Sequence, residues 1–268
     1  MKAMEKAKML PVDVVMLDLE DAVAPDLKSE ARYNIEQILS SNPFGNRETI
    51  VRINALETSW GKDDLAIVNL IKPDGVLVPK VETADDIIAI DGLLGEGIAL
   101  WVMIEMPLAI LNIQEIAAAS SSTKLAGFVL GTNDLAKEMR ATATPDRAAF
   151  MHALNVSLIA ARAYGLIAID GVYNDIKNEA GLAAECRQGQ ILGFDGKTLI
   201  HPTQIEVANS IYSPSDDEIA QAQDIIAAFD LPENQGKGVI KVNGKMTEIL
   251  HLEQAKRLIA VHNAILNQ

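Results

Sequence analysis

The sequence predicts an α/β protein with the repeat of a TIM-type (β/α)8 barrel. Seven short apolar runs recur along the chain, and each is followed by a segment with helical spacing. The runs start roughly 24 to 40 residues apart, which is enough chain for one strand and one helix. Such alternation implies a parallel sheet with right-handed crossovers. A length of 268 residues is ordinary for one barrel of this type.

The first half of the chain provides four of these strands. An amphipathic segment at 1–10 predicts a helix before the first strand. Pro25 suits the first turn of a helix, and Thr83 suits an N-cap position. The strands are predicted at 14–17, 49–54, 76–80 and 100–104, and the helices at 25–39, 61–71 and from Thr83 to the break at 95–97.

The second half provides three strands and an extension. Gly165 is placed to end the longest helix, and Asn243-Gly244 is a typical hairpin turn. The strands are predicted at 127–133, 167–170 and 197–200, and the helices at 145–164, 178–192, 215–229 and 250–266. We therefore predict a barrel domain at 1–229 and a C-terminal hairpin-helix extension at 230–268.

A closed barrel needs eight strands, whereas seven are predicted here. Because the chain begins with a helix, the missing strand would precede Met1. A gap in a barrel exposes two strand edges. We therefore expect that the sequence begins after the first barrel strand.

Composition narrows the class of protein. The net charge of −14 argues against binding to nucleic acid, which depends on clustered lysine and arginine. The one cysteine, Cys186, allows no internal disulfide and no Cys-rich metal site. The sequence has no 18-residue apolar run and no signal-peptide core at 1–10. We expect a cytoplasmic protein that does not bind membranes.

Two apolar runs each lead to an acidic residue. Glu105 follows the run at 100–104, and Asp134 follows the run at 127–133. Since α/β enzymes place their chemistry at the carboxyl ends of strands, these carboxylates are candidate site residues. Mg²⁺ commonly takes one or two protein carboxylates and leaves positions for substrate oxygens. We predict that Glu105 and Asp134 bind Mg²⁺.

Other charged residues also follow predicted strands. Arg52 and Lys80 could attract an anionic substrate, and arginine suits bidentate binding of a carboxylate. Further acids could hydrogen-bond metal-bound water; they are Asp18, Glu20, Asp21 and Asp170. An alternative is that the cluster forms structural salt bridges, with Lys80 an ordinary strand-end charge.

Several motifs together resemble a known family. They are Asp18-Leu19-Glu20-Asp21-Ala22-Val23, Lys28 with Arg32, Val51-Arg52-Ile53-Asn54, Pro79-Lys80-Val81-Glu82, Ile104-Glu105, Gly131-Thr132-Asn133-Asp134-Leu135, Gly193-Phe194-Asp195-Gly196-Lys197 and His201-Pro202. Their order and spacing resemble the citrate lyase β-subunit-like family of CoA-ester lyases, within the HpcH/HpaI aldolase superfamily. The resemblance covers nearly the whole chain and implies a (β/α)8 barrel that forms a trimer or a pair of trimers.

The resemblance also implies residue roles. It implies Mg²⁺ on Glu105 and Asp134, a 2-oxo acid bound by Arg52, and metal-bound water held by Glu20 and Asp21. Members of the family cleave or form a bond between an acyl-CoA and a 2-oxo acid, and some hydrolyse malyl-CoA. Acyl-CoA and 2-oxo acid are therefore the expected small-molecule partners.

Two departures from the family pattern matter. A first strand of the type Arg-Ser-x-Leu-Phe-Val-Pro-Gly, which helps to bind CoA, does not occur in this sequence. The family's Gly-Lys-Met-Val-Asp segment, whose Asp reaches a neighbouring active site for proton transfer, corresponds here to 244–248 and ends in Glu248. The resemblance therefore implies a catalytic role for Glu248, with a side chain one methylene longer. A helix N-terminal charge is the alternative.

Two other functions remain open. One is a metal-dependent aldolase that acts on free 2-oxo acids without CoA; relatives of that kind use a histidine base near the N-terminus. The first histidine here is His152, which disfavours that activity. The other is a non-catalytic binding subunit of an acyl-transfer complex.

Overall fold

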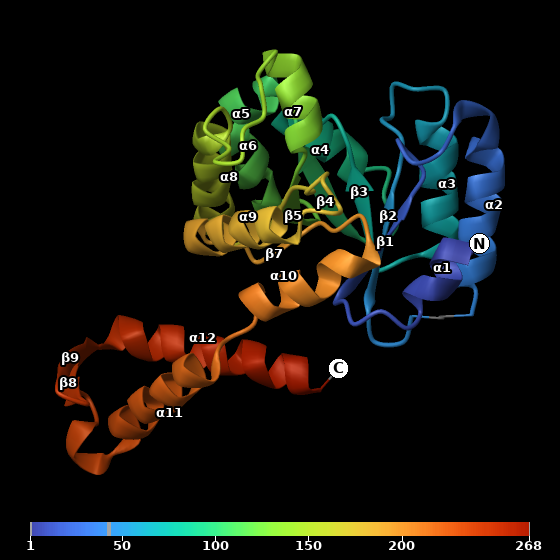
Figure 1. The fold of residues 1–268 in the computed structure, drawn as a ribbon. Coiled ribbons are helices and arrows are strands. Elements are labelled where there is room, and N and C mark those ends of the chain that lie inside the picture. Colours follow the sequence, from blue (N-terminus) through green and yellow to red (C-terminus); the bar gives the residue numbers. More distant parts are fainter. Residues whose placement is uncertain (1, 42–43, 268) are drawn as a thin grey trace. The chain divides into compact units, whose positions relative to one another are not determined.

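The seven predicted strands form one parallel sheet in the structure, a computed structural model that describes residues 2–41 and 44–267. The spatial order of the strands follows the sequence from β1 to β7, and every neighbouring pair is parallel. The sheet curls as a barrel wall does (Figure 1). Its strands are β1 (Val14–Asp18), β2 (Glu48–Arg52), β3 (Gly75–Val78), β4 (Ala99–Ile104), β5 (Leu125–Leu130), β6 (Ile167–Asp170) and β7 (Gly196–Lys197). The predicted barrel class with an incomplete set of strands is confirmed.

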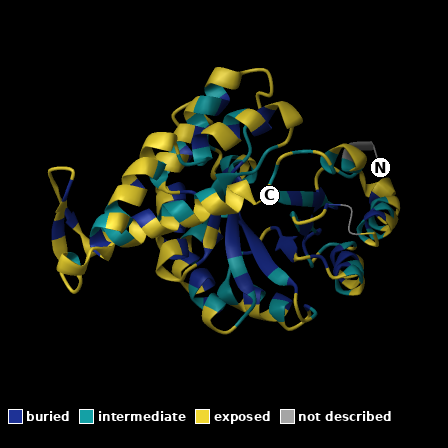
Figure 2. Cartoon of the chain, turned by 90° about the horizontal axis from the view of Figure 1, so that it is seen from below, coloured by how far each residue is buried: buried dark blue, intermediate teal, exposed yellow. Residues whose placement is uncertain are grey.

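Helices alternate with the strands, as the repeat predicted. Their solvent-facing sides are exposed, whereas the strands are largely buried (Figure 2). The helices are α1 (Lys2–Ala7), α2 (Lys28–Leu39), α3 (Gly61–Ile71), α4 (Ala84–Asp91), α5 (Pro107–Leu111), α6 (Ile113–Ala118), α7 (Thr132–Met139), α8 (Met151–Ala163), α9 (Glu179–Leu192) and α10 (Ile205–Tyr212). Of the predicted first helix, Met1 lies outside the described residues.

Several predicted boundaries differ from the structure. The strand predicted at 127–133 ends earlier, since β5 ends at Leu130 and α7 begins at Thr132, which places Asp134 in the first turn of a helix. The helix predicted from Pro145 begins only at Met151, because a turn precedes it in which Asp146 accepts hydrogen bonds from Thr144 and Ala148. Arg147 has a left-handed backbone in that turn, with φ of 55°, which a helix cannot contain. The strand predicted at 197–200 is shorter, since β7 ends at Lys197.

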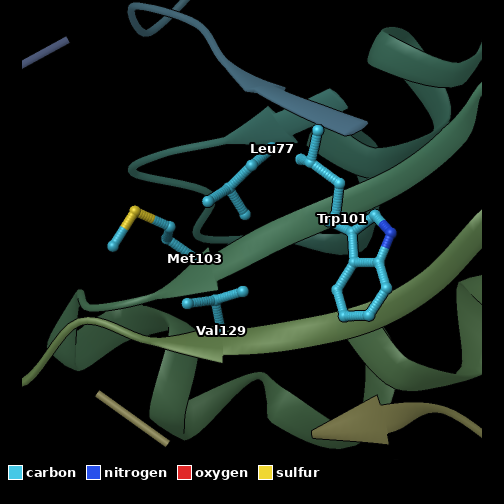
Figure 3. Close-up of a cluster of buried hydrophobic side chains, with 5 residues drawn as sticks. Leu77, Trp101, Met103 and Val129 are labelled. Atoms are coloured by element: carbon cyan, nitrogen blue, oxygen red, sulfur yellow. The ribbon is translucent and has the colours of Figure 1, made fainter. Parts of the chain in front are cut away.

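One face of the sheet carries a cluster of side chains that come only from strands. Its buried members are Ile50, Leu77, Trp101, Met103 and Val129, and Figure 3 shows four of them labelled on adjacent strands. Val14, Met16, Ala99, Ala126 and Ile169 pack against them, and these too are strand residues. Because no helix contributes, we identify this face as the inner side of the curled sheet, where barrels bury alternate strand residues.

Residues 209–268 form a second compact unit, and residues 1–208 form the first. The second unit contains α11 (Asp216–Asp230), α12 (Ile249–Leu266) and a hairpin of β8 (Val239–Val242) and β9 (Lys245–Glu248). Its core is Phe229, Ile240 and Val242, against which Ile225 and Leu252 pack. The boundary predicted at 229/230 lies inside this unit, because α11 packs on α12.

Gly127 leaves space for the Trp101 ring in the inner cluster. A Cβ at this position would lie 2.5 Å and 2.7 Å from ring atoms of Trp101, and 2.9 Å from the carbonyl oxygen of Ile167. We expect Gly127→Ala to lower the free energy of unfolding by about 1–3 kcal/mol through overpacking. Urea unfolding measures this loss.

The matched control for Gly127→Ala is Gly196→Ala in β7. There the nearest atom to a new Cβ is the Ile169 Cδ1 at 3.7 Å, an ordinary contact. We expect a change within about 0.5 kcal/mol. Equal effects of the two substitutions would contradict the tight packing of Trp101 on β5.

Candidate active site

The inner face of the sheet leads directly into a cluster of charged residues. Side chains alternate along a strand, so the rows that contain Met16, Ile50 and Met103 continue to Asp18, Arg52 and Glu105. All the strands are parallel, so these three residues meet at one edge. Apolar packing on the inner face therefore fixes where the charges lie, at the carboxyl edge where barrel enzymes act.

Arg52 is surrounded by acids from the turn after β1. Its Nε donates to Asp18 Oδ1 at 2.8 Å, and its Nη2 donates a short hydrogen bond to Asp18 Oδ2. Its Nη1 lies 2.8 Å from Glu20 Oε2 and 3.7 Å from Asp21 Oδ2. Burial alone would lower the pKa of Arg52, but Asp18 and Glu20 outweigh it and raise that pKa, so the guanidinium stays charged. The bidentate edge expected to receive substrate is occupied by Asp18.

Glu20 joins Arg52 to Lys80. Its Oε1 accepts a hydrogen bond from Lys80 Nζ at 3.0 Å, and only 6 % of the residue is exposed. Burial raises the pKa of Glu20, and the two cations counter part of that rise. Burial by itself lowers the pKa of Lys80, but the hydrogen bond and charge of Glu20 reverse the direction and raise it. Lys80 is thus a cation at this site rather than a neutral base.

Glu105 is the most deeply buried of these acids, with 1 % of the residue exposed. Its Oε1 accepts a hydrogen bond from the backbone N–H of Lys80 at 2.9 Å. That N–H is aimed by an unusual left-handed backbone at Lys80, with φ of 57°. Burial, then the charges of Glu20 and Asp134, raise the pKa of Glu105 to about 7.

The other oxygen of Glu105 has no hydrogen-bond partner among the residues that the structure describes. A Cβ on Gly131 would come within 2.5 Å of that Oε2, so glycine keeps the space beside it open. Asp134, in the first turn of α7, is close enough to raise the pKa of Glu105. A divalent cation would coordinate the unpaired oxygen, and its charge would reduce the repulsion between the two carboxylates. The residues present therefore fit Mg²⁺ on Glu105 and Asp134.

The remaining candidates belong to other groups of residues in the structure. Within the described ranges, no group of three or more acids, histidines or cysteines is arranged to hold a metal by itself. Glu248 lies in the second unit, where its backbone N–H donates to His251 Nδ1 at the start of α12. Asp170 is fully buried and accepts two hydrogen bonds from Arg147 Nη1, at 2.7 Å and 2.8 Å. It belongs to a separate ion cluster and is not exposed for water or metal.

Asp18 has a larger role than the sequence indicated. Besides holding Arg52, its carboxylate accepts hydrogen bonds from the backbone N–H groups of Glu20 and Ala22 at 2.8 Å and 3.1 Å. It therefore shapes the turn that presents Glu20 and Asp21. An Asp two residues before a turn N–H is a known local signal, but its pairing with Arg52 depends on strand register.

The sequence of this chain matches a known family. The family described as HpcH/HpaI aldolase/citrate lyase matches residues 1–202. The chain belongs to this family. The predicted resemblance is thus confirmed, and the chain is an enzyme of the lyase or thioester hydrolase type.

Similar members of the HpcH/HpaI family cover nearly all of the chain. A (3S)-malyl-CoA thioesterase of Cereibacter sphaeroides is 47% identical over 98% of this chain and 91% of its own length. The citrate lyase subunit beta of Escherichia coli is 36% identical over 93% of this chain and 85% of its own length.

Solved structures agree with this assignment. CitE from Mycobacterium tuberculosis, in complex with magnesium, acetoacetate and coenzyme A, is 29% identical to this chain. It superposes with a TM-score of 0.75 over 93% of this chain and 90% of its own. RipC from Yersinia pestis gives a TM-score of 0.70 over 79% of this chain and 94% of its own, at 29% identity. None of the helices in the described part of the chain could cross a membrane.

The raised pKa of Glu105 predicts a pH-dependent stability without metal. The folded protein binds this proton more tightly than the unfolded chain, whose carboxyl has the ordinary pKa of 4.5. The stabilisation is therefore fully present below about pH 4.5 and is lost as pH rises through 7. With a chelator present, we expect wild type to lose about 2–3 kcal/mol relative to Glu105→Gln between pH 5 and 8.

Urea unfolding at several pH values tests this difference. Glu115→Gln is the control, because Glu115 is an exposed residue on α6. Its stability relative to wild type is expected to stay constant with pH. A constant difference for Glu105→Gln as well would show that Glu105 does not bind its proton more tightly in the folded state.

Proposed function

We propose that this chain is a Mg²⁺-dependent CoA-ester lyase or thioesterase acting on malyl-CoA-like or citramalyl-CoA-like 3-hydroxyacyl thioesters. The observation that carries the proposal is the unpaired, buried oxygen of Glu105 beside Asp134, together with the half-buried Arg52 that is paired to Glu20. The activities for which the thioesterase and citrate lyase relatives are named support the thioester substrate. The magnesium of the CitE complex supports the metal.

The residues of the site divide between binding the metal, stabilising negative charge and positioning the cations. Bound Mg²⁺ would supply Lewis acidity toward the carbonyl of a 2-oxo acid. Arg52 stabilises the oxyanion that forms there through its positive charge, because Asp18 and Glu20 already contact its N–H groups. Lys80 adds a second positive charge. Glu20 keeps both cations in place. Asp21 is exposed, so its carboxylate is available to accept hydrogen bonds from water in the site.

The lyase reaction needs two proton transfers. A base removes the proton from the substrate hydroxyl, the carbon–carbon bond breaks to give the 2-oxo acid, and an acid protonates the enolate of the departing acyl-CoA. We assign the second transfer to Glu248. In thioester hydrolysis, water instead adds to the thioester carbonyl and the thiol leaves as free CoA.

The assembly forms part of the same proposal. Residues 230–268 pack on a neighbouring subunit of a cytoplasmic homotrimer or dimer of trimers, so that Glu248 of one chain serves the site of another. Glu248 stands at the N-cap of α12, in a unit with its own core. The longer side chain, compared with the family's Asp, is expected to alter the balance between cleavage and hydrolysis.

Glu105→Gln and Asp134→Asn test the metal site. We expect each to weaken Mg²⁺ binding, measured by calorimetry, by more than about 100-fold, because even outer residues of metal sites contribute 10- to 100-fold. Turnover of a panel of 3-hydroxyacyl thioesters should fall in parallel. Glu115→Gln is the matched control. Normal turnover in either site variant would refute the proposal.

The panel also separates the candidate reactions when 2-oxo acid and free thiol are measured independently. Release of 2-oxo acid without thiol identifies the lyase, and release of thiol identifies the thioesterase. Free 2-oxo-4-hydroxy acids are assayed beside the thioesters, and cleavage of these free acids alone would identify the CoA-independent aldolase. Binding of CoA esters without any turnover would identify a non-catalytic subunit of an acyl-transfer complex.

Mixing two inactive variants tests the assignment of Glu248. We expect Arg52→Ala and Glu248→Gln each to lower kcat by about 100-fold or more, with Mg²⁺ binding retained in Glu248→Gln. After the two variants are unfolded and refolded together, activity should return, because some sites then combine an intact Arg52 with an intact Glu248. Refolding each variant alone is the control. A mixture as inactive as its components would show that Glu248 does not act across subunits.

A further inference from the structure

A buried lysine lies against the backbone of the acidic turn. Lys28 is the first residue of α2 and is 5 % exposed. Its Nζ donates to the carbonyl oxygens of Leu19 and Glu20, both at 2.7 Å, and to Asn54 Oδ1 at 2.8 Å. The same Nζ lies 5.2 Å from the ring centroid of Trp60, a cation–π contact. A lysine that is this buried needs all of these partners.

Lys28 completes the hydrogen bonds of the turn that presents Glu20 and Asp21. Three N–H groups at this turn are bonded: those of Glu20 and Ala22 donate to Asp18, and that of Leu19 donates to the Arg52 carbonyl. The Glu20 carbonyl also accepts from the Val23 N–H at 3.0 Å. Lys28 supplies a charged donor to two successive carbonyl groups. Because hydrogen bonds to charged groups are stronger than neutral ones, this lysine restricts the turn more than a water molecule would.

A chain of polar contacts anchors Lys28 to two helices. The side-chain nitrogen of Asn54 donates to the Leu19 carbonyl at 2.8 Å and to Asp64 Oδ2 at 2.6 Å. Asp64, fully buried in α3, also accepts from Arg32 Nη1 of α2 at 2.8 Å. The ammonium group is therefore held from α2 and from the segment after β2, independently of the site's own ion pairs.

We propose that Lys28 is a positioning residue, which fixes the turn at 19–21 so that Glu20 can hold Arg52 and Lys80 in their working places. The proposal rests on the proposed function for its catalytic consequence, whereas its structural consequence stands alone. Lys28 touches no expected substrate atom and acts only through the turn. Its loss should therefore loosen the turn and lower the rate without removing any group from the site.

Hydrogen exchange of metal-free protein tests the structural part. We expect Lys28→Met to speed the exchange of backbone amides at 19–23 by about 10-fold, because the turn loses its charged donor. The substitution leaves no buried carboxylate unpaired, so we expect it to fold. Should its cooperative unfolding transition be lost, Lys28→Gln, which keeps an amide donor, takes its place under the same criteria.

Lys124→Met is the matched control. Lys124 also donates to a backbone carbonyl and a carboxylate, those of Asp91, both at 3.2 Å, but it precedes β5 at the opposite edge of the sheet. Its loss should leave exchange at 19–23 and kcat unchanged within about 2-fold. Unchanged exchange at 19–23 in Lys28→Met, or equal acceleration in both variants, would overturn the proposal.

A double-mutant cycle with Glu20→Gln tests the catalytic part. We expect Lys28→Met to lower kcat by about 10- to 100-fold with KM changed by less than about 2-fold, since positioning acts on the reacting geometry. In the Glu20→Gln background the same substitution should cost less than about 3-fold, because both changes act through one group. Equal losses in the two backgrounds would overturn a role through Glu20.

Failure of the proposed function is distinguishable from failure of this inference. If wild type turns over no thioester, the proposed function fails, whereas exchange at 19–23 still decides whether Lys28 holds the turn. If wild type is active and exchange at 19–23 does not respond to Lys28→Met, the inference alone fails.

Discussion

The carboxyl edge of the sheet carries more negative charge than its own cations can balance. Five acids gather there, namely Asp18, Glu20, Asp21, Glu105 and Asp134, against Arg52 and Lys80. The protein meets part of this imbalance by ion pairing and part by raising the pKa of Glu105 to about 7. A divalent cation would remove the rest, since it favours the ionised form of both Glu105 and Asp134. Electrostatic need and the proposed chemistry thus point to the same place.

Packing inside the barrel wall decides which acid is left unpaired. Trp101 fills the space over Gly75 and Gly127 on the two flanking strands, which seals the inner face below the site. Above it, Gly131 leaves a gap beside Glu105 Oε2, while the Lys80 backbone N–H binds Oε1. These two glycines have opposite effects: Gly127 allows close packing of Trp101, whereas Gly131 leaves space beside Glu105.

Much of the fold followed from local pattern, and the differences have local causes as well. All seven strands were predicted, because each is an apolar run at a spacing set by one helix. The helix predicted from Pro145 began late, since turn contacts of Asp146 and the left-handed Arg147 override its helical periodicity. The division at 208/209 was not visible either, because α11 has the amphipathic pattern of a barrel helix but packs on α12.

The site was predicted in its composition and only partly in its pairing. Strand ends identified Arg52, Lys80, Glu105 and Asp134, but no pattern showed that Asp18 would hold the bidentate edge of Arg52. Partners such as Lys28 and Asn54 are 26 residues apart, and Asn54 and Asp64 come from different elements. Such contacts depend on strand register and helix packing, which periodicity does not specify.

Two buried lysines show a common way of fixing the loops at this edge. Lys28 binds the carbonyls of Leu19 and Glu20 after β1, and Lys197, whose side chain is fully buried, binds the Gly171 carbonyl after β6 at 2.6 Å. Loops after strands lack a regular ladder to satisfy their carbonyl groups. A buried ammonium can bond several of them at once, and its own desolvation cost is offset only if they stay in place. The same hydrogen bonds that offset the lysine's desolvation therefore hold the loop, so the order of the acidic turn is built into the scaffold before any substrate or metal arrives.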